Sequence, residues 1–203
     1  MTRLLSASGE DHLSREHLRE ALLHSVILAG VAVASYWLVS HALGQIYSIS
    51  KDDDRLGAMW AVIASVFVYR FTYRDSLKAA MSRAAATFLA IVLCLVYLTW
   101  LPFHLWGLAV LLGAGTLIML LAGRPDDIVS TAATITVVLV VAAVTPRDAW
   151  EQPLLRLVDT LVGIVIGLVG AWIDLHLRPA LRLPIDAAPP ARESAPGPGA
   201  TRP

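Results

Sequence analysis

The sequence has few charged residues, a single cysteine and no net charge. Charged residues make up 16% of the 203 positions and hydrophobic residues 57%, whereas about a quarter of a typical soluble domain is charged. This shortage argues against an ordinary soluble domain and favours lipid as the solvent for most of the chain. Because the formal net charge is zero, no overall basic field would attract nucleic acid. We therefore expect a lipid bilayer as a partner and no nucleic acid.

Residue patterns that carry enzyme chemistry are missing as well. The one cysteine, Cys94, lies inside an apolar run, where it can form neither an intrachain disulfide nor a metal site by itself, so we interpret it as a packing residue. No group of His, Cys, Asp and Glu has metal-ligand spacing, no nucleotide-binding loop is present, and no serine is accompanied by a base. We predict no enzymatic activity, no cofactor and no metal. Acidic residues crowd the first 20 positions, which is not typical of a cleavable signal peptide.

Six apolar stretches follow one another along the chain, and most approach the roughly 20 residues that a helix needs to cross a bilayer. They are Leu22–Leu43, Leu56–Tyr69, Ala84–Leu101, Leu105–Ala122, Ile128–Val144 and Leu154–Leu177. The pattern predicts an all-α integral membrane protein, a bundle of six transmembrane helices. The second stretch is short and ends at Arg70, so a re-entrant segment is an alternative there. We expect residues 1–21 to form a cytoplasmic amphipathic segment, residues 22–177 the transmembrane domain, and residues 178–203 a disordered tail rich in Pro, Ala and Gly.

The basic residues predict the orientation of the helices, because Lys and Arg accumulate in cytoplasmic loops. With six crossings, twelve of the 16 basic residues fall on the side of the N-terminus and four on the opposite side. The twelve are Arg3, Arg15, Arg19, Arg70, Arg74, Lys78, Arg83, Arg124, Arg178, Arg182, Arg192 and Arg202, and the four are Lys51, Arg55, Arg147 and Arg156. We expect both termini in the cytoplasm. We expect the protein to lie in a bacterial inner membrane and to cross it several times.

The second half of the chain resembles the first when the sequence is shifted by 73 residues. FTYRDSLKAAMSRAAAT then falls on VTPRDAWEQPLLRLVDT, and five polar positions coincide. They are Thr72 with Thr145, Arg74 with Arg147, Asp75 with Asp148, Arg83 with Arg156, and Thr87 with Thr160. Each half would hold three helices, so the halves would have opposite orientations, which is the inverted repeat that many transporters use. The alternative is coincidence.

Both matched segments carry the pattern R-x-x-x-T-x-x-small, which places an arginine and a hydroxyl on one helix face. We interpret Arg83, Thr87, Arg156 and Thr160 as candidate substrate-binding residues, since a guanidinium directed into a cavity binds carboxylates. The alternative is that both arginines, which would lie near helix ends, extend to lipid headgroups. Asp159 is a candidate proton-coupling carboxylate, and its alternative is an ion pair with Arg156 on the same helix.

Other polar and small residues suggest structural roles. Gly163, Gly167 and Gly170 give the last helix a face for close helix packing, inside the bundle or between subunits. Trp60 and four other tryptophans would lie near helix ends, as in the aromatic belt of a membrane protein. Asp174 beside Arg178 is interpreted as ordinary interfacial charge.

The run GAMWAVIASVFVYRFTYRDSLKAAMSRAAATFLA and the later run LLRLVDTLVGIVIGLV resemble the fusaric acid resistance and aromatic acid exporter family. In that family an apolar helix opens with Trp, here Trp60. Entries of the form R-x-x-x-T-x-x-G and R-x-x-D-T-x-x-G follow, here at Arg83 to Ala90 and at Arg156 to Gly163. Ala90 departs from the family glycine. Members join two six-helix units to a soluble region, so the resemblance implies that this chain is one unit and needs a partner, either a second copy in a homodimer or a separate six-helix half.

The residues and the resemblance together predict an inner-membrane transporter-like protein that exports organic or aromatic carboxylates, with proton coupling as one energy source. A small organic anion would be the substrate. The alternatives are a passive anion channel and a membrane assembly protein that transports nothing and uses its glycine face for helix association.

Overall fold

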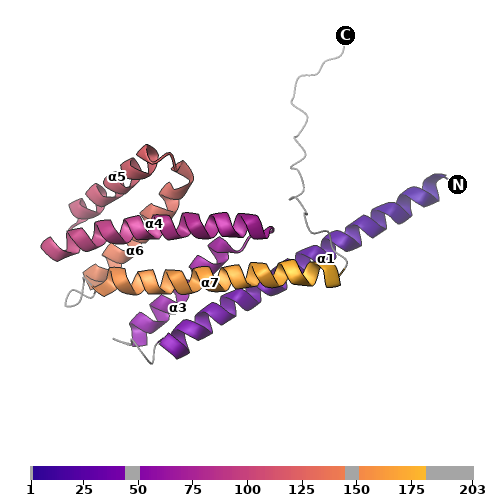
Figure 1. Cartoon of the computed structure of the whole chain (residues 1–203), viewed down its shortest axis with the longest axis horizontal. Helices are drawn as coiled ribbons and strands as arrows, with labels where there is room; N and C mark the ends of the chain where they lie inside the picture. The colour runs from indigo at the N-terminus through magenta and orange to yellow at the C-terminus, as the bar shows by residue number, and fades with distance from the viewer. Residues whose placement is uncertain (1, 44–50, 145–150, 182–203) are drawn as a thin grey trace, which may run out of the picture.

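The computed structural model describes the backbone of residues 2–43, 51–144 and 151–181, and the side chains of residues 18–41, 55–144 and 151–181. All regular secondary structure in these ranges is helical (Figure 1). The elements are α1 (Thr2–Trp37), its π-helical continuation η1 (Leu38–Leu43), α3 (Lys51–Val68), α4 (Tyr73–Trp100), α5 (Leu105–Leu121), the short 3-10 helix η2 (Pro125–Asp127), α6 (Ile128–Val144) and α7 (Glu151–Ala180).

Four of the helical segments are long and apolar enough to cross a bilayer, and this confirms a helical membrane protein. They are Leu18–His41, Tyr73–Trp100, Pro125–Val144 and Glu151–Ala180. Two further apolar helices, Arg55–Val68 and Leu105–Leu121, are shorter. With a rise of 1.5 Å per residue, the 17 residues of α5 extend about 26 Å, just below the thickness of a typical hydrocarbon core. Six crossings therefore stay a prediction.

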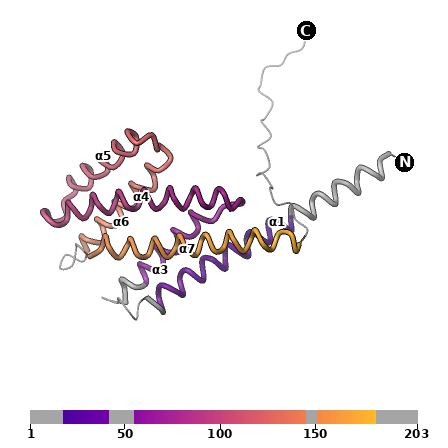
Figure 2. The backbone as a smooth tube through the Cα atoms, viewed as in Figure 1, coloured from indigo at the N-terminus to yellow at the C-terminus, as the bar shows by residue number. Residues whose placement is uncertain are grey.

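Helix α7 lies at the centre of the bundle, as the tube in Figure 2 shows. It packs along α3 on one side and along α4 on the other, and α4 and α7 run side by side in opposite directions (Figure 1). Beyond this central group, α1 packs on α3, and α6 packs on α4 and carries α5 on its outer side. Polar side chains of α4 and α7 can therefore approach one another from neighbouring helices.

Several helix boundaries differ from those of the predicted apolar stretches, most of all at the start of α4. Helix α4 begins at Tyr73 and not at Ala84, because the charges of its first turns are exposed and can be solvated by water or headgroups. One of them, Asp75, pairs with Lys78 at 3.9 Å. A carboxylate at this position also favours a helix N-terminus. Helix α7 continues to Ala180, so residues 178–180, which we assigned to the tail, are helical. The remainder of the predicted tail, residues 182–203, lies outside the described residues.

The N-terminal segment does not form a helix of its own. Residues 2–21, which we expected to precede the first crossing, are continuous with the apolar part of α1 in one helix. The side chains of residues 2–17 lie outside the described set, so the amphipathic character predicted for the segment stays a prediction.

Small residues on α7 permit its close contact with α3 and α1. A Cβ atom added to Gly163 would lie 2.7 Å from the Cβ of Ala64, and one added to Gly167 would lie 2.8 Å from the carbonyl oxygen of Ser65. Gly170 faces Val31 of α1 in the same way. These glycines are occupied by contacts inside the chain, so the G-x-x-x-G surface is not available to a second subunit.

Candidate functional site

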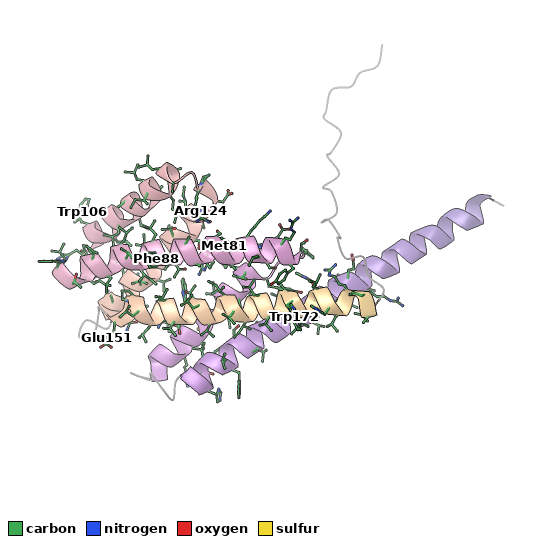
Figure 3. The ribbon with its side chains drawn as sticks, viewed as in Figure 1. Met81, Phe88, Trp106, Arg124, Glu151 and Trp172 are labelled. Carbon is green, nitrogen blue, oxygen red and sulfur yellow. The ribbon has the colours of Figure 1, made fainter. Side chains whose placement is uncertain are left out.

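Arg83 lies inside α4 as the eleventh residue of the helix, which places it about 15 Å along the helix axis from Tyr73. Its side chain is only 4% exposed. By contrast, Met81 and Phe88 of the same helix, labelled in Figure 3, are 67% and 63% exposed. The α4 face that carries Arg83 is therefore directed into the bundle, and the opposite face is directed outward.

The Arg83 guanidinium has aromatic neighbours on α3 and a hydroxyl neighbour on α6. Its central carbon lies 5.3 Å from the ring centre of Trp60 and 5.2 Å from that of Phe67. Each such contact stabilises a cation by about 0.5 to 2 kcal/mol. The Nη1 group donates a hydrogen bond of 2.7 Å to Ser130 Oγ. These contacts hold the planar group in one place between three helices.

Part of the Arg83 side chain has no partner. The Nε and Nη2 atoms are buried without a hydrogen bond, as is the hydroxyl of Thr87 one turn further along α4. Among the described residues, no carboxylate pairs with Arg83 within 4.0 Å. An unpaired charge in a low-dielectric interior is costly. The arrangement therefore provides a positive charge and two adjacent N–H donors for an anion.

Arg156 near the start of α7 has a different environment. It is 1% exposed, and its Nη1 atom lies 3.0 Å from a carboxylate oxygen of Asp159. This is the intrahelical ion pair that we considered for Asp159. The carboxylate lies against α3 at Gly57, where an added Cβ atom would be 2.8 Å from either oxygen. The glycine thus makes room for the charged pair between α3 and α7.

Trp60 connects the two arginine motifs. Its indole Nε1 donates a hydrogen bond of 2.9 Å to Thr160 Oγ1, and the same ring faces the Arg83 guanidinium. Thr160 in turn donates to the backbone carbonyl of Arg156 at 2.7 Å. Among the predicted site residues, Arg83 and Thr160 are therefore joined through one aromatic side chain that comes from a third helix.

The structure corrects two interpretations and adds residues that the sequence analysis did not assign to the site. Arg83 does not lie at a helix end and does not extend to the outer surface, because α4 begins well before it. Trp60 belongs to no aromatic belt, since it is buried in the middle of α3. Phe67 and Ser130 were not singled out. Phe67 follows Trp60 by seven residues, two helical turns, and this spacing is the only signal that could have found it.

Asp127 forms a second polar contact between the same helices. Its carboxylate accepts a hydrogen bond from Ser82 of α4 and pairs with Arg124 at 2.8 Å. This contact lies one turn from Ser130 and holds the start of α6 against α4. Among the described residues, no group of three or more His, Cys, Asp and Glu side chains could hold a metal ion.

The family comparison covers the helices that form this site. The model of the family described as fusaric acid resistance protein-like matches residues 31–170, which are 140 of the 203 residues and include both arginine motifs and Trp60. Comparisons with curated proteins and with solved structures give no match. The protein therefore belongs to the fusaric acid resistance protein-like family, whose function is related to membrane transport.

Proposed function

We propose that this protein is an inner-membrane transporter-like protein that exports organic carboxylates, aromatic ones above all, and that Arg83 receives the carboxylate. The observation that carries this proposal is the burial of the Arg83 guanidinium without a carboxylate partner among the described residues. A structural arginine in a membrane helix would be expected to pair with an acidic group or with carbonyls. Here an anionic substrate would supply the missing charge.

The free atoms of Arg83 suit a carboxylate. Nε and Nη2 lie on one edge of the planar guanidinium, and this edge can donate two parallel hydrogen bonds to the two oxygens of a carboxylate. The Thr87 hydroxyl is an additional donor on the same helix face. The rings of Trp60 and Phe67 beside the guanidinium offer apolar surface to an aromatic ring attached to that carboxylate.

Arg156 and Thr160 would form the second part of the substrate path. Because Arg156 is paired with Asp159, a substrate carboxylate would have to compete with Asp159 for the guanidinium. Uptake of a proton by Asp159 would remove that competition. In this way the pair would couple substrate movement to a proton gradient, with Asp159 as the coupling group.

The helix contacts support six crossings built as two inverted repeats. The shift of 73 residues makes α3 equivalent to α6 and α4 equivalent to α7. An inverted repeat therefore requires that the packing of α3 against α7 has a counterpart in the packing of α6 against α4, and both pairs are in contact. The same equivalence relates α1 on α3 to α5 on α6, which also pack together. In this proposal both termini are cytoplasmic, and a second six-helix unit, from another copy or another chain, completes the transporter.

Flux measurements in liposomes test the proposal. The purified full chain should release a trapped aromatic carboxylate faster than its neutral amide, and an imposed pH gradient should increase the rate. Arg83→Gln should abolish this flux, whereas the matched control Arg70→Gln, which changes an exposed arginine, should preserve it. Rates that saturate with substrate concentration favour a carrier over a channel. Equal flux in wild type and Arg83→Gln at equal protein density would refute the assignment, and no flux at all in wild type would favour an assembly role.

A further inference from the structure

The two arginine motifs differ at the third residue after the arginine. In α7 this residue is Asp159, whose carboxylate lies 3.0 Å from Arg156 Nη1. In α4 it is Ala86, which is fully buried and lies on the same side of its helix as Arg83, since residues three apart are neighbours on a helix surface. The position from which a carboxylate of the same helix could pair with Arg83 therefore exists inside the bundle, and a methyl group occupies it.

The residues that approach the two motifs from the neighbouring helices differ as well. Asp159 lies against Gly57 of α3, where an added Cβ atom would be 2.8 Å from either carboxylate oxygen. The shift of 73 residues makes Ser130 of α6 the counterpart of Gly57, and Ser130 Oγ accepts the hydrogen bond of 2.7 Å from Arg83 Nη1. One arginine thus has a carboxylate and a glycine at these two positions, and the other has an alanine and a neutral hydroxyl.

This exchange satisfies one N–H group of Arg83 without neutralising its charge. The carboxylate that α6 provides one turn before Ser130, that of Asp127, pairs with Arg124 at 2.8 Å and accepts a hydrogen bond from Ser82. Among the described residues, Arg83 therefore keeps an uncompensated positive charge, and its Nε and Nη2 donors are buried without a hydrogen bond. An anion from outside the chain would supply what Asp159 supplies to the other arginine.

Resting on the carboxylate transport proposed above, we propose that Ala86 and Ser130 reserve Arg83 for an external carboxylate. Ala86 withholds an internal counter-ion, and Ser130 is a positioning residue that holds Nη1, so that the Nε and Nη2 edge is left for the ligand. Arg156 with Asp159 is the occupied counterpart of this arrangement, in which the chain itself provides the carboxylate.

Thermal unfolding of the purified full chain in detergent, with and without benzoate, tests the proposal without a transport assay. Benzoate should raise the unfolding temperature of the wild type, because a ligand that binds the folded state stabilises it. Ala86→Asp should abolish this rise, since a carboxylate beside Arg83 neutralises the guanidinium and repels the ligand. The matched control is Ala86→Asn, which is equal in size but neutral and should keep most of the rise.

The same measurement tests the positioning role of Ser130. Ser130→Ala should raise the benzoate concentration that gives half of the temperature rise by about tenfold, because the guanidinium loses the bond that fixes Nη1. Ser130→Thr keeps the hydroxyl and should restore the wild-type concentration. Equal benzoate concentrations in Ser130→Ala and the wild type would overturn this role.

A double-mutant cycle without benzoate shows whether the new carboxylate meets the guanidinium. Ala86→Asp should lower the unfolding temperature by about 4 °C or more beyond its effect in the wild type when it is made in an Arg83→Gln background, because the carboxylate is then buried without a cation. If Ala86→Asp alone does not insert into the membrane, its combination with Ser130→Gly decides, since the pair reproduces the arrangement of Asp159 and Gly57.

The outcomes separate this inference from the proposed function. No effect of benzoate on the wild type would overturn both. A benzoate effect that is lost in Arg83→Gln but kept in Ala86→Asp would overturn the inference alone and leave Arg83 as the carboxylate site. Equal effects of Ala86→Asp in the two backgrounds, or failure of both Ala86→Asp variants to insert while Ala86→Asn inserts, would also overturn it.

Discussion

Replacing Arg83 with lysine tests whether the guanidinium fork, and not only a positive charge, is needed. Lysine keeps the charge and can still lie against an aromatic ring, but its ammonium cannot present two parallel donors to a carboxylate. In the structure, one edge of the Arg83 guanidinium is free while Nη1 is bonded to Ser130 at 2.7 Å. A lysine in this place would have to serve Ser130 and the substrate with one ammonium group.

The expected loss follows from the energy of the charged hydrogen bond that disappears. Such a bond contributes roughly 1.5 to 3 kcal/mol, which corresponds to about ten- to hundredfold weaker binding. Arg83→Lys should therefore raise the substrate concentration needed for half-maximal flux by about that factor, while the protein inserts normally and unfolds at a similar temperature.

The assay is a concentration series of carboxylate flux in liposomes at equal protein density, with Arg70→Lys as the control. Thermal unfolding of the same preparations in detergent shows whether the fold is intact. An Arg83→Lys variant with the half-saturation concentration of the wild type would show that a simple positive charge is sufficient, and the bidentate geometry proposed for Arg83 would then be wrong.

Three further predictions concern packing and topology. Trp60→Phe should keep the ring beside Arg83 but remove the hydrogen bond to Thr160, so the free energy of unfolding should fall by about 1 kcal/mol plus the loss from the smaller ring. The loss caused by Trp60→Phe should be smaller in a Thr160→Val background, and an equal loss in both backgrounds would contradict the contact of the two residues. Gly163→Ala should destabilise the protein by roughly 1 to 3 kcal/mol, because the added Cβ would clash with α3. The control Gly113→Ala should not, because Gly113 has open space around it, and equal unfolding temperatures of the two variants would contradict the close contact of α3 and α7. Reporter fusions should be cytoplasmic after Arg74, Arg124 and Arg182 and external near Asp53, Pro102 and Arg147, and an external reporter at Arg124 would break the model of six crossings.

Hydropathy alone determined the class of this protein and the approximate position of its helices. Long apolar runs cannot remain in water and must satisfy their backbone hydrogen bonds within the chain, so helices in lipid follow from composition. The motifs around Arg83 and Arg156 were visible for the same reason, since a charged residue stands out in an apolar run. The helix boundaries were less certain: charged first turns, such as those of α4, look like a loop in a hydropathy pattern.

Only the tertiary structure decided which side chains meet. A sequence shows that Arg83 lies on one face of a helix, but the neighbours of that face come from α3 and α6, which are distant in the chain. For the same reason Trp60 looked like an interfacial residue until α7 was packed beside it. Asp174 and Arg178 looked like solvated charges until α1 covered them with Glu20. Whether a charge in a membrane helix faces headgroups, a counter-ion or a substrate depends on the helix packed against it, and local sequence does not encode that neighbour.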